Sequence, residues 1–72
     1  MTDARDFILE YIHQHDDPVP TRKLINALLE SVFSRKEAWK ALDALEKEGY
    51  ITLLGGNWFL TPSGMEIMGW LV

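Results

Sequence analysis

The fold of this chain is decided by residues 34–51, which read SRKEAWKALDALEKEGYI. Ser34 suits a helix N-cap, and Glu37 three residues later completes a capping box, in which each side chain accepts a hydrogen bond from a free backbone N–H at the helix start. Gly49 supplies the left-handed residue that commonly closes a helix. We therefore predict an amphipathic helix over residues 34–48. Its apolar stripe has spacings of one, three and four residues and consists of Ala38, Ala41, Leu42 and Leu45.

The charges at the start of this helix oppose its dipole. Arg35 and Lys36 put positive charge at the positive end of the dipole, and Lys36 repels Lys40 one turn later. Each arrangement is unfavourable by roughly 0.3 kcal/mol, and a bound anion would reverse the sign of both. Two interpretations stay open: contact with nucleic-acid phosphates or base edges, or an ordinary solvated lysine face.

Size and composition indicate one small globular domain over residues 1–72. The hydrophobic fraction is 47%, which argues against disorder, and every apolar run is shorter than the ~18 residues of a membrane span. Nothing resembles a signal peptide, so we expect a cytoplasmic location and no membrane partner. A core this small rarely contributes more than roughly 3–5 kcal/mol of net stability, so a dimer or another partner is expected to matter.

The sequence offers no catalytic or metal-binding constellation. The absence of cysteine excludes disulfides, a thiol nucleophile and a cysteine zinc site. No phosphate-binding glycine loop is present, and no nucleophile has a neighbouring base. His13 and His15 lie two residues apart on a predicted helix and so point in different directions, which disfavours a shared metal. We expect no enzymatic activity, no cofactor and no metal.

The net charge of −4 hides a segregation along the chain. Residues 1–20 carry a net charge of −4, residues 21–40 carry +3, and residues 41–72 carry −3. A local basic patch governs contact with phosphates, whereas the charge of the whole molecule governs long-range steering. The basic third is therefore the segment that bears on nucleic-acid binding.

A first helix is predicted over residues 3–15, with Asp3 as its cap and apolar residues at helical spacing. The sequence Asp16-Asp17-Pro18 ends it, because the residue before a proline avoids helical dihedrals. Val19-Pro20 then reads as a short extended link.

A second helix is predicted over residues 21–30, with Thr21 as its cap. Arg22 and Lys23 stand at its N-terminus, where backbone N–H groups already favour an anion, so phosphate contact and plain solvent exposure both stay open. Residues 31–33 are too few for more than a turn. This helix and the helix that Ser34 begins therefore form a helix-turn-helix.

The segment after Gly49 has the pattern of a tight β-hairpin over residues 50–61. Gly55-Gly56-Asn57 offers the residues that a turn with positive dihedrals requires, and no lysine or arginine lies at the tip. The predicted cross-strand partners on one face are Ile51 and Leu53 with Trp58 and Leu60.

These elements, in this order, resemble the winged-helix domain over nearly the whole chain. Residues 34–51 look like the recognition helix and its exit in the MarR and PadR type of bacterial and archaeal transcriptional regulators. Residues 60–64, LTPSG, resemble the segment that leads from the second wing strand into the next helix. The resemblance implies a mainly α fold with a small β-hairpin (α+β): a winged helix-turn-helix with a three-helix core, a wing and a C-terminal helix.

The resemblance implies a transcriptional regulator of prokaryotic or viral kind that binds double-stranded DNA. Arg22 and Lys23 would lie on the flanking DNA backbone, and Arg35 or Lys36 could address guanine O6 and N7. Trp39, at the edge of the apolar stripe, is expected to be a core residue or a packing shoulder rather than a base-contacting ring. The residues implied in the major groove are Ser34, Arg35, Lys36, Glu37 and Lys40.

The C-terminal helix, predicted over residues 62–71 with Thr61 as cap and Pro62 at its first position, supports a competing function. It is apolar on more than one side, so part of it could form a homodimer or partner site. The alternative to DNA binding is therefore a protein-interaction module or accessory subunit. The residues of this predicted interface are Met65, Met68, Trp70, Leu71 and Val72.

Overall fold

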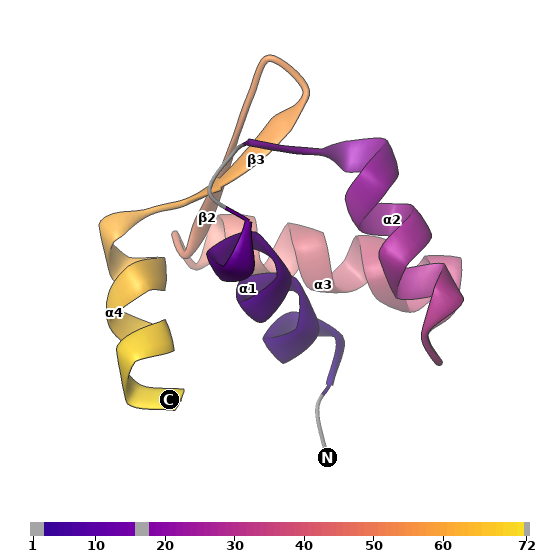
Figure 1. The fold of residues 1–72 in the computed structure, drawn as a ribbon, viewed down its shortest axis with the longest axis horizontal. Coiled ribbons are helices and arrows are strands. Elements are labelled where there is room, and N and C mark those ends of the chain that lie inside the picture. Colours follow the sequence, from indigo (N-terminus) through magenta and orange to yellow (C-terminus); the bar gives the residue numbers. More distant parts are fainter. Residues whose placement is uncertain (1–2, 16–17, 72) are drawn as a thin grey trace.

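A computed structural model describes residues 3–15 and 18–71 of the chain. Within these ranges the chain is mainly helical with a small antiparallel sheet, which confirms the α+β class (Figure 1). None of the helices in the described ranges is both long and apolar enough to cross a bilayer. The elements in order are α1 (Ala4–Gln14), β1 (Val19–Pro20), α2 (Thr21–Glu30), α3 (Arg35–Lys47), β2 (Ile51–Leu54), β3 (Asn57–Leu60) and α4 (Pro62–Leu71).

The sheet has the strand order β1-β3-β2, and both pairings are antiparallel. The register of the hairpin β2–β3 matches the predicted cross-strand partners: Ile51 faces Leu60, and Leu53 faces Trp58. The turn is shorter than predicted, because Asn57 already pairs with Leu54. Gly55 and Gly56 alone form it, with φ of 60° and 80°, as a two-residue hairpin turn requires.

The link at Val19-Pro20 is a strand, which the sequence did not predict. Val19 pairs with Trp58 and Pro20 with Asn57, so β1 adds an edge to the hairpin. Proline is tolerated there because an edge strand does not need every N–H for pairing. Val19 is 1% exposed and joins the core, which gives this short segment a fixed position.

Local hydrogen bonds explain where the helices begin and end. Asp3 caps α1 by accepting from the Asp6 N–H at 2.9 Å, and α1 ends at Gln14. Of the predicted break at Asp16-Asp17-Pro18, residues 16 and 17 lie outside the described ranges. Thr61 caps α4 as predicted, since its Oγ1 accepts from the Gly64 N–H at 3.1 Å.

The predicted capping box at the start of α3 is confirmed. The Ser34 Oγ accepts from the Glu37 N–H at 3.1 Å, and the Glu37 carboxylate accepts from the Ser34 N–H at 3.2 Å. Gly49 follows α3 with φ of 83°, as its predicted closing role requires.

The predicted cap of α2 was wrong. Pro20 holds the N-cap position and makes no side-chain capping bond, while Thr21 is the first helical residue. The Thr21 N–H and hydroxyl both donate to the Gly56 carbonyl oxygen at 3.1 Å. The hydroxyl that was expected to cap a helix instead joins α2 to the turn of the hairpin.

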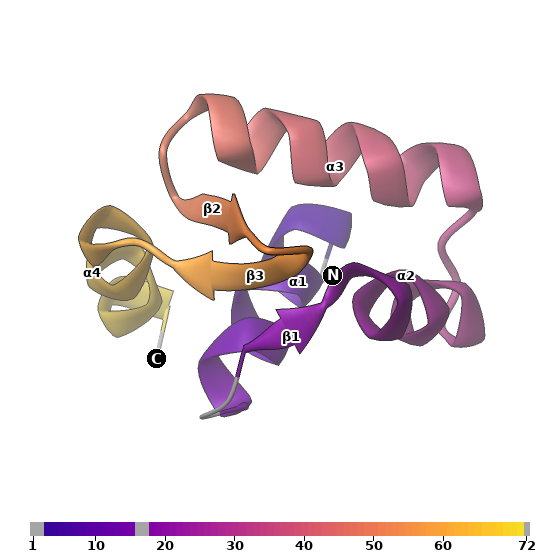
Figure 2. The same cartoon turned by 90° about the horizontal axis from the view of Figure 1, so that it is seen from above.

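One hydrophobic core joins all the elements. α1 contacts α2, α3, α4 and β3, and its Ile8 is fully buried. In Figure 2 the helix α4 lies at one end of the molecule and the turn between α2 and α3 at the other. The largest fully buried side chains are Ile8, Leu24, Leu28, Leu42, Leu45, Ile51 and Val19.

Candidate nucleic-acid interface

The outward face of α3 carries most of the cations that the sequence singled out. The predicted apolar stripe is buried: Ala38, Ala41, Leu42 and Leu45 are each at most 6% exposed. Helical periodicity therefore turns the polar side of α3 to solvent. The exposed residues of this side include Arg35, Lys36, Trp39, Lys40, Asp43 and Lys47.

Two acidic side chains of α3 are engaged locally. Asp43 forms an exposed ion pair with Lys47 one turn later, with the Nζ–Oδ2 distance at 3.1 Å. Glu37 is held in the capping box by the Ser34 N–H. Such a surface pair contributes little stability, but it partly offsets the negative charge that would otherwise repel an anion.

The cations of residues 21–40 have no ion-pair partner in the part of the chain that the structure describes. The ion pairs within residues 3–15 and 18–71 are Arg5–Asp3 and Lys47–Asp43. The five cations of the basic third are all exposed and make no ion pair with any residue in these ranges: Arg22, Lys23, Arg35, Lys36 and Lys40.

The structure separates these cations into two groups. Arg22 and Lys23 line a surface groove with Tyr11 and Glu30, beside the turn of the hairpin that Thr21 holds. The start of α3 lies at the other end of α2 (Figure 1). Ten helical residues span roughly 15 Å, so the two groups are two contact points rather than one patch.

Arg5 is a further cation near α3 that the sequence did not indicate. It lines a groove of about 410 Å³ together with Asp3, Glu37 and Lys40. Its guanidinium lies 3.7 Å from the Asp3 carboxylate, and about half of its side chain is exposed. Nothing local could have indicated this position, because Arg5 lies on α1, far along the chain from Glu37 and Lys40 on α3.

Trp39 lies at the edge of the buried stripe of α3. At 48% exposed it is half-buried, which rules out the core position but agrees with the predicted packing shoulder. It lies one turn after Arg35 and Lys36, so the indole adjoins the unpaired cations at the helix start.

No protein-family model, curated protein or solved structure matches this chain. Function is therefore inferred from the geometry of the chain itself.

The predicted interface on α4 is only partly available in the single chain. Met65 is 61% exposed, but Met68 is 3% exposed and belongs to the core, so its assignment to a surface was wrong. It is buried because α4 packs against α1 and β3. The side chains of Trp70 and Leu71, and the whole of Val72, lie outside the described part.

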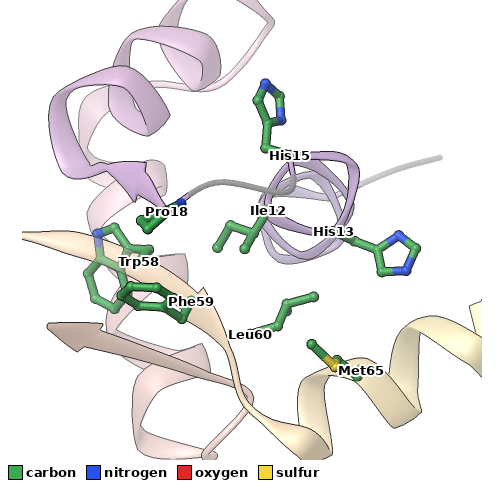
Figure 3. A pocket seen from close by; sticks show the side chains of 8 residues that line it. All are labelled: Ile12, His13, His15, Pro18, Trp58, Phe59, Leu60 and Met65. Carbon is green, nitrogen blue, oxygen red and sulfur yellow. The ribbon is translucent and has the colours of Figure 1, made fainter.

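A second hollow, of about 210 Å³, lies between the end of α1, β3 and α4 (Figure 3). His13 and His15 line it, and their imidazoles point away from one another. The His15 ring stacks on Tyr11, and its Nδ1 lies 2.7 Å from the Tyr11 carbonyl oxygen. Among the described residues, no three His, Cys, Asp or Glu side chains converge on a possible metal position.

Proposed function

We propose that this chain is a small DNA-binding transcriptional regulator of the winged helix-turn-helix type. In this proposal α2 and α3 are the helix-turn-helix, α3 is the recognition helix in the major groove, and the hairpin β2–β3 is the wing. The order of elements supports it, including the turn of Ser31-Val32-Phe33-Ser34 between α2 and α3. The observation that carries the proposal is that Arg35, Lys36 and Lys40 on α3 are exposed and make no ion pair with any described residue, while Glu37 and Asp43 are engaged locally.

The start of α3 suits an anion for two reasons. Backbone N–H groups and the helix dipole attract negative charge there, and Arg35 and Lys36 add full positive charges. In the proposed complex Arg35 or Lys36 contacts guanine, and Lys40 contacts phosphate. Ser34 keeps a hydroxyl proton for a phosphate oxygen, because its oxygen acts as the acceptor in the capping box. Glu37, held at the helix start by the Ser34 N–H, also faces the major groove in the proposed complex.

The second contact point lies at the start of α2. Arg22 and Lys23 are exposed beside the hairpin turn, so in the proposed complex they bind the DNA backbone that flanks the groove. The whole molecule has a net charge of −4, which opposes long-range attraction. We therefore expect modest affinity that depends strongly on salt.

The test compares duplex DNA binding by the wild type and a Lys36→Gln/Lys40→Gln variant over a range of salt concentrations. Each phosphate contact contributes about 0.9 to the slope of log affinity against log salt. With Lys40 on phosphate and Lys36 on guanine, the variant's slope is shallower by about 0.9, and its affinity at low salt falls by roughly tenfold or more.

A charge-matched control is available. Gln14→Glu/Ser63→Glu lowers the net charge by the same amount at exposed positions outside α2 and α3. This control should keep the wild-type slope. The absence of binding at low salt, or equal slopes for all three proteins, would contradict the proposal.

The second candidate is a protein-interaction module, favoured by the hairpin. Leu53 is 41% exposed and Leu54 is 62% exposed, and residues 51–60 contain no lysine or arginine. Such a surface suits an apolar partner better than a phosphate backbone. A homodimer through α4 also remains a prediction. Light-scattering masses of the wild type and Trp70→Ala test it, since two equal monomer masses would exclude it.

A further inference from the structure

The indole of Trp39 has an unusual position for a tryptophan in a small domain. Among the large apolar residues that are exposed in the described part of the chain, Trp39 is the aromatic one, and it is 48% exposed. Packing in the core does not explain it, since the buried stripe of α3 is complete without it. Leaving so much apolar surface in water stabilises nothing within the single chain.

The surroundings of this side chain are cationic. Arg35 and Lys36 lie four and three residues before it on the same helix, so their side chains are its neighbours on the helix surface. Asp43, four residues after it, is paired with Lys47. A ligand that fits here must bring negative charge to Arg35 and Lys36 and an apolar group to the indole.

The major groove of duplex DNA offers one base edge with matching chemistry. Thymine presents the O4 acceptor beside the apolar C5 methyl group, whereas adenine, guanine and cytosine carry no methyl group at that edge. The indole has the complementary pair, an apolar ring and a single N–H donor. The phosphates on either side of the groove supply the negative charge for the cations.

We propose that Trp39 is a specificity-determining residue that recognises thymine through its C5 methyl group. The inference rests on the proposed function, because it needs α3 in the major groove. It goes further in naming the preferred DNA, which carries thymine at the position next to the base that Arg35 or Lys36 contacts. Burying one methyl group is worth about a fourfold gain in affinity.

The test uses a fluorescently labelled duplex of mixed sequence and the same duplex made with deoxyuridine in place of every thymine. This replacement removes the methyl groups but keeps O4, the pairing and the charge. Wild-type protein at low salt should bind the thymine duplex about fourfold more tightly than the deoxyuridine duplex. Trp39→Ala should bind the two duplexes equally, and Trp39→Phe should keep the preference.

Leu54→Ala is the matched control, because it removes another exposed apolar side chain, on the hairpin, and should leave the preference unchanged. The preference of the wild type between the two duplexes tests the inference even if Trp39→Ala does not fold. A thermal melt shows whether that variant folds. Equal binding of both duplexes by the wild type, or a preference that survives in a folded Trp39→Ala, overturns the inference and leaves DNA binding intact. If the wild type binds neither duplex, the proposed function fails, and this inference fails with it.

Discussion

Gly64 and Gly69 lie on the same helix, α4, but in opposite surroundings. A Cβ atom at Gly64 would lie 2.1 Å from the Tyr50 carbonyl oxygen, while one at Gly69 would meet nothing within 4 Å. That carbonyl also accepts from the Thr61 N–H at 3.1 Å, so the backbone around it is fixed where α4 begins. The absence of a side chain at Gly64 allows this close approach.

We therefore expect the same substitution to act in opposite directions at these two positions. Gly64→Ala should lower the free energy of unfolding by about 1–3 kcal/mol, as overpacking of a fixed backbone does. Gly69→Ala should raise it by up to about 1 kcal/mol, because alanine favours the helix. Chemical denaturation of both variants measures the difference. Equal effects would show that α4 does not approach Tyr50 this closely.

At the scale of single residues, the sequence is sufficient to predict a contact when its two partners are close together along the chain. The capping box needs only Ser34 and Glu37 at the right spacing, and it was predicted correctly. Whether Trp39 and Met68 are buried depends instead on which side of their own helix the other elements pack against. The groove with α1 borders α3 at Lys40 and Ala44, so Trp39 on the other flank is left exposed. The spacing of apolar residues along α3 does not show which of its two flanks α1 covers.

At the scale of elements, the attachment of the hairpin turn to α2 is the main addition to what the sequence predicted. Two donors of Thr21 share the Gly56 carbonyl oxygen, and Pro20 pairs with Asn57 just before it. The hairpin is thus held at its turn as well as at its base. In the proposed DNA complex this attachment fixes the wing next to Arg22 and Lys23.

Thr21→Val should weaken this attachment while preserving the shape of the side chain. We expect a loss of about 1 kcal/mol in the free energy of unfolding, the net value of one hydrogen bond. The Thr21 amide, whose N–H donates to the same carbonyl, should exchange with solvent faster. Thr52→Val, on β2, is the control and should leave that exchange rate unchanged. An unchanged rate in Thr21→Val would mean that the hydroxyl does not hold the turn.

The helices and the hairpin were predictable because each carries its own periodicity and its own end signals. The predicted helices over residues 21–30 and 62–71 have the observed bounds, and the predicted register of the hairpin is correct. β1 was missed because two residues show no alternation, and Val19 is placed only by its pairing with Trp58. A second tertiary contact, between Thr21 and the Gly56 carbonyl oxygen, explains the error at Thr21, whose polar side chain suits either a cap or a long-range partner.

At the scale of the whole molecule, charge is distributed along the longest direction. The cations Arg35 and Lys36 lie next to the turn between α2 and α3, and α4 lies at the opposite end (Figure 2). Glu48 caps the far end of α3, and Glu66 is exposed on α4. The helix α3 has 13 residues and so spans roughly 20 Å, which exceeds the Debye length of about 8 Å at physiological salt. These acids can therefore influence the approach of DNA more than the bound complex.

Glu48→Gln/Glu66→Gln, which changes the net charge from −4 to −2, should accordingly act mainly on the association rate. At about 0.01 M salt, where the Debye length is about 30 Å, we expect association with duplex DNA to be roughly twofold faster, because the molecule repels phosphates less. The gain should disappear at about 1 M salt, where the Debye length is about 3 Å. At physiological salt, where the Debye length is about 8 Å, the dissociation rate should not change, in contrast to Lys36→Gln/Lys40→Gln, which removes contacts made in the complex. Stopped-flow association and dissociation rates at several salt concentrations measure both. A slower dissociation of Glu48→Gln/Glu66→Gln at physiological salt would place DNA at the α4 end of the molecule and contradict a complex centred on the start of α3.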